Sequence, residues 1–460
     1  MTSRSAPAPT ETASLDLVPR HALVVGFAVT GRAVARALID HGCTVTVTDD
    51  AATDDQRTHA AELGADWVDA PSPSGWTDLV AGYDGVLVSP GFAERHPVFA
   101  AAAATGVPLR SELDLAAAWD DRPVALITGT NGKTTVTSMV TEMLLTSGLA
   151  AVPAGNVEVP LVAAITDPDV EVFVVEASSF RLTHATGHHP VVATWLNFAP
   201  DHLDVHHDLA GYEAAKANLW RNHDAGGLAV ANADDPVVTA HAPAGGRTQT
   251  FGLGPDADWH IADGRLRGPG GLDLVAVTDL AQARPHDQAN ALAAAATAFA
   301  VGASPEALGS ALRTFAGLPH RVELVGEAGG VRWYDDSKAT APHATVAAIS
   351  GFDHAVLIAG GRNKGLDLAA LAPLAPRLRA VVAIGDAAAL VAAAFAGRVP
   401  VTVAASMDAA VAAAAGGAHP GDVVVLSPAC ASFDWYRDYA ERGRDYQRAV
   451  RQHLAAEATP

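Results

Sequence analysis

The segment that most constrains the fold of this chain is a glycine-containing turn between an apolar run and a helical pattern. The turn is Gly129-Thr130-Asn131-Gly132-Lys133-Thr134-Thr135, with the apolar run at 124–128 and the helical pattern at 136–147. A strand, a glycine turn and a helix form a phosphate-binding loop, where backbone N–H groups and the helix dipole hold an anion. In such loops the lysine reaches the outer phosphates and the next hydroxyl binds Mg²⁺, which predicts these roles for Lys133 and Thr134.

The loop departs from the most common phosphate-loop spacing. That pattern has a glycine six residues before the lysine, where this chain has Ile127, and the first glycine, Gly129, lies only four residues before it. We therefore interpret the loop as a shortened variant. The alternative is a structural glycine turn with a solvated lysine, which the flanking strand and helix disfavour.

Strands alternate with helical patterns along the chain, which predicts α/β domains with mainly parallel sheets. The length of 460 residues suggests about three domains. A charged, proline-containing break at 120–123 closes the first block, and a third block begins near 318. A Gly- and Asp-rich stretch over 242–285 shows poor periodicity. The expected strands cover 21–27, 44–48, 85–89, 124–128, 170–176, 191–196, 355–359, 380–384 and 423–426.

Polar residues and glycines follow many of these strands. Ligands bind at the carboxyl ends of parallel strands, so a site is expected at that edge of each block. The residues placed there are Asp49, Ser89 and Gly91, then Gly129–Thr134, Glu176 and Asn197, then Gly360, Gly361 and Ser427. Three such blocks suggest one enzyme that joins several substrates.

Composition excludes some classes of partner. The formal net charge of −21 disfavours binding to nucleic acid or to an anionic membrane. Cys43 and Cys430 form no disulfide framework, and no uncharged apolar run reaches about 18 residues, so no membrane-spanning helix is expected. The first 17 residues have no apolar signal region and are interpreted as a disordered tail.

Two further patterns leave alternatives open. The segment Gly26–Gly31, followed by Asp49, resembles a dinucleotide fingerprint, but Ala28 replaces its middle glycine, so another nucleotide or a plain strand–turn–helix is favoured. Glu176 ends a buried apolar strand, where a carboxylate either holds Mg²⁺ or makes a structural salt bridge.

Charged clusters elsewhere also have competing explanations. Six potential metal ligands lie within Asp201–Asp208. A dedicated zinc site is disfavoured, because the segment has no cysteine and lacks the histidine spacing of zinc proteases. A metal-binding role for one or two of these residues is still open. On pattern alone Lys216 is an ordinary helix lysine. The third block of this acidic chain contains three cations, Arg321, Lys338 and Lys364. A site that binds phosphates and carboxylates close together would require such cations.

Taken together, these motifs resemble those of the Mur ligases, ATP-dependent amide-forming enzymes of peptidoglycan assembly. The resemblance runs from about His21 to the C-terminus. The shortened phosphate loop marks the whole superfamily, which includes folylpolyglutamate synthase. The segments 336–340 and 426–434 resemble the glutamate-adding branch, and the Asp-Asn-Pro-Arg motif of the branches that add diaminopimelate or lysine is absent.

The resemblance implies a fold of three α/β domains. These are a Rossmann-like UDP-substrate domain over 18–122, a central P-loop ATPase-type domain over 123–317, and a Rossmann-like amino-acid-binding domain over 318–460. The implied reaction adds D-glutamate to UDP-N-acetylmuramoyl-L-alanine with ATP, two Mg²⁺ ions and a carbamate on Lys216, in a cytoplasmic monomer. The alternatives are a related ligase for another amino acid, L-glutamate included, and a catalytically silent nucleotide-binding protein.

The resemblance also implies roles for individual residues. Catalysis is expected of Lys133, Glu176, His202, Lys216 and Lys338, and Mg²⁺ binding of Thr134, Glu176, His202 and carbamylated Lys216. ATP contacts are expected from Gly129, Thr130, Asn131, Gly132, Lys133, Thr134, Thr135, Asn290, Arg321 and Asp336. UDP-substrate contacts are expected from Thr30, Asp49, Asp50, Ser89, Gly91 and Asn156. Amino-acid contacts are expected from Lys338, Thr340, Lys364, Ser432 and Tyr439.

Several residues depart from the family pattern. Ala28 and Glu158 replace glycines, and Arg181 replaces a glutamine. Asp287 replaces an asparagine near the expected adenine contact, and Ala341 replaces an asparagine after the Ser-Lys-Ala-Thr run. Tyr439 stands where phenylalanine is common. None of these changes removes a residue expected to act in phosphate transfer.

Overall fold

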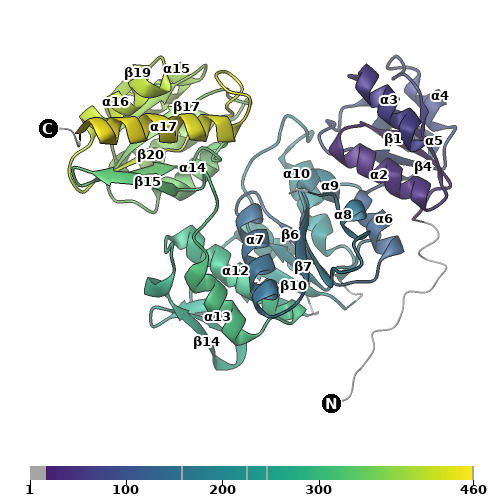
Figure 1. The fold of residues 1–460 in the computed structure, drawn as a ribbon, viewed down its shortest axis with the longest axis horizontal. Helices are drawn as coiled ribbons and strands as arrows, with labels where there is room; N and C mark the ends of the chain where they lie inside the picture. Colours follow the sequence, from purple (N-terminus) through teal and green to yellow (C-terminus); the bar gives the residue numbers. More distant parts are fainter. Residues whose placement is uncertain (1–16, 157–158, 224–225, 245–246, 458–460) are drawn as a thin grey trace. The chain divides into compact units, whose positions relative to one another are not determined.

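The computed structural model describes residues 17–156, 159–223, 226–244 and 247–457 (Figure 1). The expected tail, apart from Leu17, and Glu158 therefore lie outside the described residues. The chain divides into two compact units, and the linker segments 199–204 and 281–288 belong with the second. The first unit contains the two parallel sheets that the sequence places before residue 318, and the second contains the last sheet.

The first sheet has the strand order β3-β2-β1-β4-β5 and is parallel throughout. Alternate residues of β1 pack into different cores: Ala22 and Val24 face the side of α2, while Leu23 and Val25 face the side of α4 and α5. A sheet covered on both faces explains the nearly continuous apolar runs of β1 and β4. The elements are β1 His21–Val25, α2 Val29–Asp40, β2 Thr44–Thr48, α3 Asp54–Leu63, β3 Asp66–Trp67, α4 Trp76–Val80, β4 Gly85–Val88, α5 Pro97–Thr105, β5 Leu109–Arg110 and α6 Glu112–Trp119.

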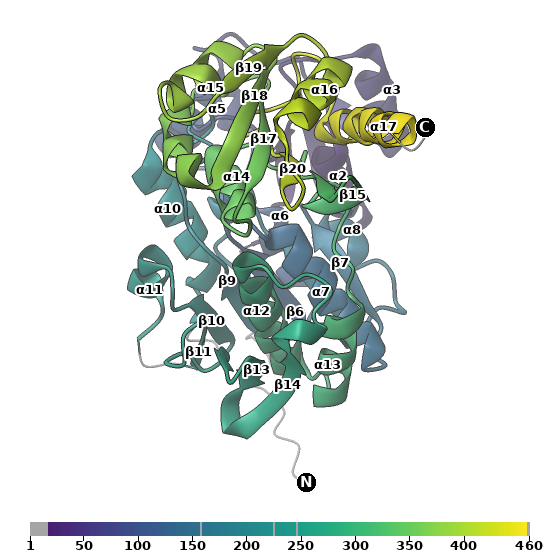
Figure 2. The same cartoon turned by 90° about the vertical axis from the view of Figure 1, so that its left-hand side faces the viewer.

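The second sheet is also parallel and has the order β11-β10-β9-β6-β8-β7. The phosphate-loop strand β6 lies inside it, between β8 and β9, with α7 and α12 nearby (Figure 2). The elements are β6 Val124–Thr128, α7 Lys133–Thr146, β7 Ala151–Gly155, α8 Leu161–Ala164, β8 Val172–Glu176, α9 Ser179–Leu182, β9 Val192–Trp195, α10 Leu209–Ala217, β10 Leu228–Asn232, α11 Pro236–His241 and β11 Thr248–Phe251. A short 3₁₀ turn, Asn218–Trp220, follows α10 directly.

The stretch at 242–285 that shows poor periodicity contains a small antiparallel sheet, β12-β13-β14. Its strands are β12 His260–Ala262, β13 Arg265–Gly268 and β14 Leu272–Ala276, separated by glycine turns. Strands of three to five residues are too short to produce a clear alternation. The helices α12 Pro285–Val301 and α13 Pro305–Thr314 follow.

The last sheet has the order β15-β16-β20-β17-β18-β19 and is parallel except for β15, which pairs antiparallel with β16. Its elements are β15 Glu323–Ala328, β16 Val331–Asp335, α14 Pro342–Ile349, β17 Ala355–Gly360, the 3₁₀ segment η5 Leu368–Arg377, β18 Leu378–Ile384, α15 Ala388–Phe395, β19 Val401–Ala404, α16 Met407–Gly417, β20 Val423–Leu426 and α17 Tyr439–Glu457. The sequence did not indicate β15 or β16, because this edge hairpin is half exposed and its pairing is interrupted by a bulge near Gly326.

The predicted α/β class with mainly parallel sheets is confirmed. The expected strands all occur, with ends displaced by at most two residues. Among the described residues, no helix is long and apolar enough to span a membrane. The domain boundaries at 122 and 317 stay predictions.

Candidate active site

The phosphate loop joins β6 to α7 as the sequence predicts. Gly132, at the N-terminus of α7, has a φ of 81°, in the left-handed region that favours glycine. A Cβ atom there would lie 2.5 Å from Oδ1 of Asn290, a residue of α12. The glycine therefore allows Asn290, an expected ATP contact, to approach the loop.

Asn197, which follows β9, holds this loop in shape. Its carbonyl accepts from the N–H of Thr130 at 3.0 Å, and its Oδ1 accepts from the N–H of Asn131 at 2.8 Å. Its Nδ2 donates back to the Asn131 carbonyl at 3.2 Å. Lys133 folds over the loop, with Nζ donating to the Gly129 carbonyl at 2.8 Å. Sequence reasoning placed Asn197 at a strand end but assigned it no role.

Glu176 lies at the carboxyl end of β8, between β6 and β7. Its side chain is buried, and Oε1 accepts from Nδ2 of Asn156 at 3.0 Å. Its other oxygen, Oε2, has no hydrogen-bond partner within the part of the chain that the structure describes. An unsatisfied buried carboxylate oxygen is costly, and a hard divalent cation would satisfy it. The residues at this edge therefore fit Mg²⁺, and Asn156, an expected substrate contact, orients the carboxylate.

Lys216 lies on α10 with only 1% of its surface exposed, next to the phosphate loop. Its Nζ donates to the Gly129 carbonyl at 2.8 Å and lies 4.8 Å from the centre of the Tyr212 ring. The Tyr212 hydroxyl is 3.1 Å from Oγ1 of Thr130. The helical pattern gave no reason to single out Lys216, because this position beside the loop is created by tertiary structure.

Near the carboxyl edge of the first sheet lies a cavity of about 30 Å³. It is lined by residues of the first sheet, its connections and the segment after β8, including Thr30, Ser89, Arg110, Glu112, Arg181 and His184. Ser89 donates from Oγ to the Gly26 carbonyl at 2.6 Å, so the two loops are tied together. The expected substrate residues Thr30 and Ser89 are thus brought to one cavity, where Glu112 offsets the positive charge of Arg181 and Arg110 adds a further cation.

The remaining expected substrate residues shape the neighbouring loops. Asp49 accepts from the N–H of Phe27 at 2.7 Å, so its carboxylate orders the turn that carries Ala28. Asp50 is ion-paired with His96, at 3.1 Å from its Nε2. Gly91 has a φ of 107°, which favours glycine after the strand β4.

Arg181, a departure from the family pattern, lies on α9 after strand β8 of the second sheet and makes a buried contact with helices α2 and α6 of the first block. Its guanidinium forms an ion pair with Glu112 of α6, and NH2 donates to Oγ1 of Thr30 at 3.2 Å. Its carbonyl accepts from Oγ of Ser111 at 2.9 Å. Burial lowers the pKa of Arg181 to about 10, which leaves the side chain charged at neutral pH.

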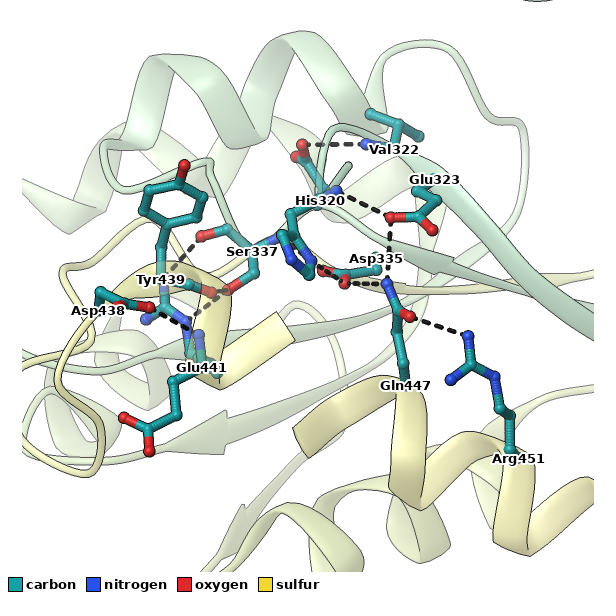
Figure 3. Close-up of polar contacts among 12 residues, drawn as sticks. His320, Val322, Glu323, Asp335, Ser337, Asp438, Tyr439, Glu441, Gln447 and Arg451 are labelled. Atoms are coloured by element: carbon teal, nitrogen blue, oxygen red, sulfur yellow. Dashed lines mark hydrogen bonds and ion pairs between the residues drawn. The ribbon is translucent and has the colours of Figure 1, made fainter. Parts of the chain in front are cut away.

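In the second unit, a polar network surrounds His320 (Figure 3). Its Nδ1 donates to Oδ2 of Asp335 at 2.6 Å, and its backbone N–H donates to Glu323 at 2.9 Å. Gln447 of α17 donates to both carboxylates, at 2.9 Å and 3.0 Å. The hydrogen bond that His320 donates to Asp335 raises the pKa of His320. The side chains of His320, Glu323 and Asp335, three potential metal ligands, are therefore paired within the protein. The network fixes the turn that carries Arg321.

Asp336, an expected ATP contact, is buried beside the same turn. Its Oδ2 accepts from Oγ of Ser427 at 2.7 Å, and its Oδ1 accepts from the N–H of Val322 at 3.3 Å. Burial raises the pKa of Asp336 to about 7, although the nearby Arg321 opposes the rise. This carboxyl group therefore titrates near neutral pH.

The segment 337–341 meets the start of α17. Nζ of Lys338 lies 3.8 Å from the centre of the Tyr439 ring, a cation–π contact. Oγ of Ser337 donates to the Tyr439 carbonyl at 2.7 Å. Arg442, which is buried, donates to Ser337 and to the Cys430 carbonyl, and thus joins this segment to the one that carries Ser432. Sequence reasoning missed Arg442, since an arginine in a charged helix gives no signal of its own.

The structure places the other predicted residues as follows. Thr340 lies before α14, with its N–H donating to the Lys338 carbonyl at 2.9 Å. Lys364 lies in the loop after β17, and Ser432 is buried after β20. Thr134 and Thr135 lie in the first turn of α7, and Ala341 is the N-cap residue of α14.

Two more predicted residues lie in the linker segments that belong with the second unit. His202 has a φ of 56°, and its Nε2 is 3.7 Å from the carboxylate of Asp201. Burial raises the pKa of Asp201, but His343 and His202 outweigh that effect and hold it well below its usual value. Asp287 accepts from Nε of Arg284 at 2.6 Å at the start of α12.

Comparison with protein families matches three regions of the chain. Residues 20–111 match the Mur ligase MurD-like N-terminal domain, residues 127–298 the Mur ligase middle domain, and residues 320–430 the Mur ligase glutamate ligase domain. The UDP-N-acetylmuramoylalanine–D-glutamate ligase of Frankia casuarinae is 44% identical over 464 residues, which cover 96% of each chain. The ligase of the same name from Thermobifida fusca is 39% identical, over 95% of this chain and 99% of the relative.

Solved structures share the fold at low sequence identity. A pseudomurein peptide ligase type C from Methanothermus fervidus matches with a TM-score of 0.60 at 18% identity, over 94% of this chain and all of its own. The UDP-N-acetylmuramate–alanine ligase MurC from Thermotoga maritima matches with a TM-score of 0.55 at 17% identity, over 95% of this chain and all of its own. The three-domain α/β fold is thereby confirmed, and the sequence relatives show that this chain belongs to the Mur ligase family.

Proposed function

We propose that this chain joins D-glutamate to UDP-N-acetylmuramoyl-L-alanine in an ATP-dependent reaction of peptidoglycan precursor synthesis. The observation that carries the proposal is similarity over 96% of the chain to a ligase named for that reaction. The match to a glutamate ligase domain over 320–430 supports the choice of amino acid. A charged, buried active-site edge with Lys133, Glu176 and Lys216 disfavours the silent nucleotide-binding alternative.

In the first step, an oxygen of the alanyl carboxylate attacks the γ-phosphorus of ATP, and ADP leaves. Both reactants are anions, so the site must offset their repulsion. The N–H groups of the phosphate loop and the ammonium of Lys133 provide fixed positive charge where the transferred phosphoryl group develops negative charge. The preformed loop, held by Asn197, needs little rearrangement for this role.

Two Mg²⁺ ions are part of the proposal. Thr134, Glu176, His202 and Lys216, the last as a carbamate, would hold them. When bound, the ions neutralise phosphate charge. Carbamylation would turn Lys216 from a buried cation into a carboxylate, which suits its place beside the phosphate loop.

In the second step, the amine of D-glutamate attacks the acyl carbon, the bond from that carbon to the phosphate oxygen breaks, and phosphate leaves. The ammonium of Lys338 stabilises the oxyanion or the departing phosphate, held in place by Tyr439. Lys364, Thr340 and Ser432 form the rest of the amino-acid pocket. D over L selectivity depends on the shape of this pocket.

The other substrate contacts complete the proposal. Asn290, Arg321 and Asp336 bind ATP, and the cavity lined by Thr30 and Ser89 belongs to the UDP-substrate site, with Asp49, Asp50, Gly91 and Asn156 around it. The proposal places the enzyme in the cytoplasm, where ATP is available, as a monomer.

A phosphate-release assay tests the proposal. Protein, ATP, Mg²⁺, UDP-N-acetylmuramoyl-L-alanine and D-glutamate are mixed, and each component is omitted in turn. The expected result is release that requires both organic substrates, and replacement of D- by L-glutamate is expected to abolish it. Release with L-glutamate alone would identify a different ligase of the superfamily, and no substrate-dependent release would support the silent alternative.

A further inference from the structure

A partly buried contact lies between the loop after β4 in the first sheet and the segment before α10 in the central part of the same unit. The carboxylate of Glu94 accepts from Nδ1 of His206 at 2.7 Å and from the N–H of His207 at 2.9 Å. The backbone N–H of Glu94 donates to the Val205 carbonyl at 2.9 Å. One residue of the substrate-side loop thus binds three consecutive residues of the central part.

The chemistry of this contact favours a charged carboxylate. Burial raises the pKa of Glu94, but the hydrogen bonds from His207 and His206 outweigh that effect and lower it overall. The His206 side chain is 1% exposed, so its bond to a carboxylate is charge-assisted and poorly screened by solvent. Because Nδ1 donates to Glu94, Nε2 of a neutral His206 ring accepts a hydrogen bond from the hydroxyl of Ser179. The distance between Nε2 and Oγ of Ser179 is 2.8 Å.

His206 also contacts one residue next to the proposed UDP-substrate site and one residue next to the phosphate loop. Its ring stacks on Phe180 with 5.5 Å between centroids, and Phe180 lines the cavity assigned to the UDP-substrate. On another side it packs against Tyr212, with 5.3 Å between centroids. The Tyr212 hydroxyl contacts Thr130 in the phosphate loop at 3.1 Å. A continuous set of contacts therefore runs from Glu94 through His206 and Tyr212 to the phosphate loop.

We infer that Glu94 and His206 are a positioning pair, which holds the substrate-side sheet and the phosphate loop in the alignment needed for attack on ATP. The inference rests on the proposed function. Under that function the UDP-substrate binds in the cavity beside the first sheet and ATP binds at the phosphate loop of the second, so the approach of the alanyl carboxylate to the γ-phosphate depends on how firmly the two sheets are joined. Small errors in such alignment reduce the rate of the chemical step even when each substrate still binds.

This role predicts a specific kinetic signature. Loss of the pair should lower kcat and leave the KM values for ATP and the UDP-substrate nearly unchanged, because neither residue is a proposed ligand of either substrate. Glu94→Gln removes the charge and keeps the shape, and His206→Phe keeps an aromatic ring on Phe180 without the hydrogen bonds. We expect each to lower kcat by about tenfold, the effect of one charge-assisted hydrogen bond.

The double variant separates a shared role from two independent defects. If the residues act as one pair, the double variant should also lose about tenfold rather than a hundredfold, because each single change already breaks the contact. Glu213→Gln is the matched control: Glu213 accepts from His241 at the same distance, 2.7 Å, in a more exposed pair. It should keep the wild-type kcat.

The measurement is steady-state phosphate release with each substrate varied, normalised to folded protein by circular dichroism. Multiplicative losses in the double variant, a rise in KM with unchanged kcat, or an equal loss in Glu213→Gln would overturn the inference. His206→Gln provides a second variant if His206→Phe folds poorly, and is expected to keep more activity because its amide can still donate to Glu94. Failure of the wild-type protein to release phosphate would contradict the proposed function instead, so the two failures are distinguishable.

Discussion

The buried ion pair between Arg181 and Glu112 allows a quantitative prediction about a residue that departs from the family pattern. Both side chains are almost fully buried, and Arg181 also donates to Thr30. Removal of one partner leaves an uncompensated charge in the interior, which costs about 3–5 kcal/mol. For Glu112→Gln we expect about 3 kcal/mol, the lower end, because the neutral glutamine carbonyl can accept a hydrogen bond from the Arg181 guanidinium.

The double variant Glu112→Gln/Arg181→Gln should recover most of this loss. It removes the orphaned charge and restores the glutamine that the family pattern has at this position, so the remaining cost is that of ordinary hydrogen bonds. For a domain of 150–250 residues, about 3 kcal/mol corresponds to a decrease in Tm of roughly 6–12 °C. The exposed pair Arg265–Asp273 provides the control, and Asp273→Asn should change Tm by less than about 2 °C.

The assay is thermal unfolding followed by circular dichroism, read at the first transition because the chain has several domains. We expect Glu112→Gln to unfold well below the wild type and the double variant close to it. If Glu112→Gln melts with the wild type, or if the double variant is as unstable as the single one, the buried pair does not stabilise this contact and the reasoning is refuted.

Three further predictions concern the proposed site. Lys216→Ala should lose most phosphate release and regain part of it with added acetate or formate, which replace a carbamate; full activity of the variant would exclude a carbamate role. Asp336→Asn should become more stable relative to the wild type as pH rises from about 4 to 7, by up to about 1.4 kcal/mol per pH unit. The folded-state pKa of Asp336 is raised to about 7, so the folded wild type is stabilised while this carboxyl group is protonated and loses that stabilisation as the pH rises toward 7. Parallel urea melts of both proteins at several pH values measure the difference in the free energy of unfolding. Asn197→Ala should raise the Kd for ATP about tenfold with little change in Tm, since it removes the two side-chain hydrogen bonds that hold Asn131 of the phosphate loop; unchanged calorimetric affinity would contradict it.

Much of the site could be predicted because the carboxyl ends of parallel strands lie together at one edge of a sheet. The sequence alone placed Glu176 and Asn197 at strand ends, and the structure brings both to the edge where the phosphate loop begins. Lys133 was evident from the turn that contains it. In these cases the local pattern and the topology determine the position.

Other residues could not be found in this way. Lys216, His206 and Arg442 owe their positions to tertiary contacts with segments far away in the sequence, and a helix lysine or arginine carries no local signal of burial. Resemblance to a family pointed to Lys216, but not to His206 or Arg442. The hairpin of β15 and β16 was missed for the opposite reason, because its half-exposed strands lack a continuous apolar run.

The most direct test of the proposed ligase reaction follows the oxygen atoms. UDP-N-acetylmuramoyl-L-alanine labelled with ¹⁸O in the alanyl carboxylate is incubated with ATP, Mg²⁺, D-glutamate and the protein, and the released phosphate is analysed by mass spectrometry. Attack of the carboxylate on ATP, followed by attack of the amine on the acyl carbon, predicts one ¹⁸O atom in each phosphate. Phosphate without label, formed at the same rate, would show that ATP is hydrolysed by water and would contradict the acyl-phosphate mechanism.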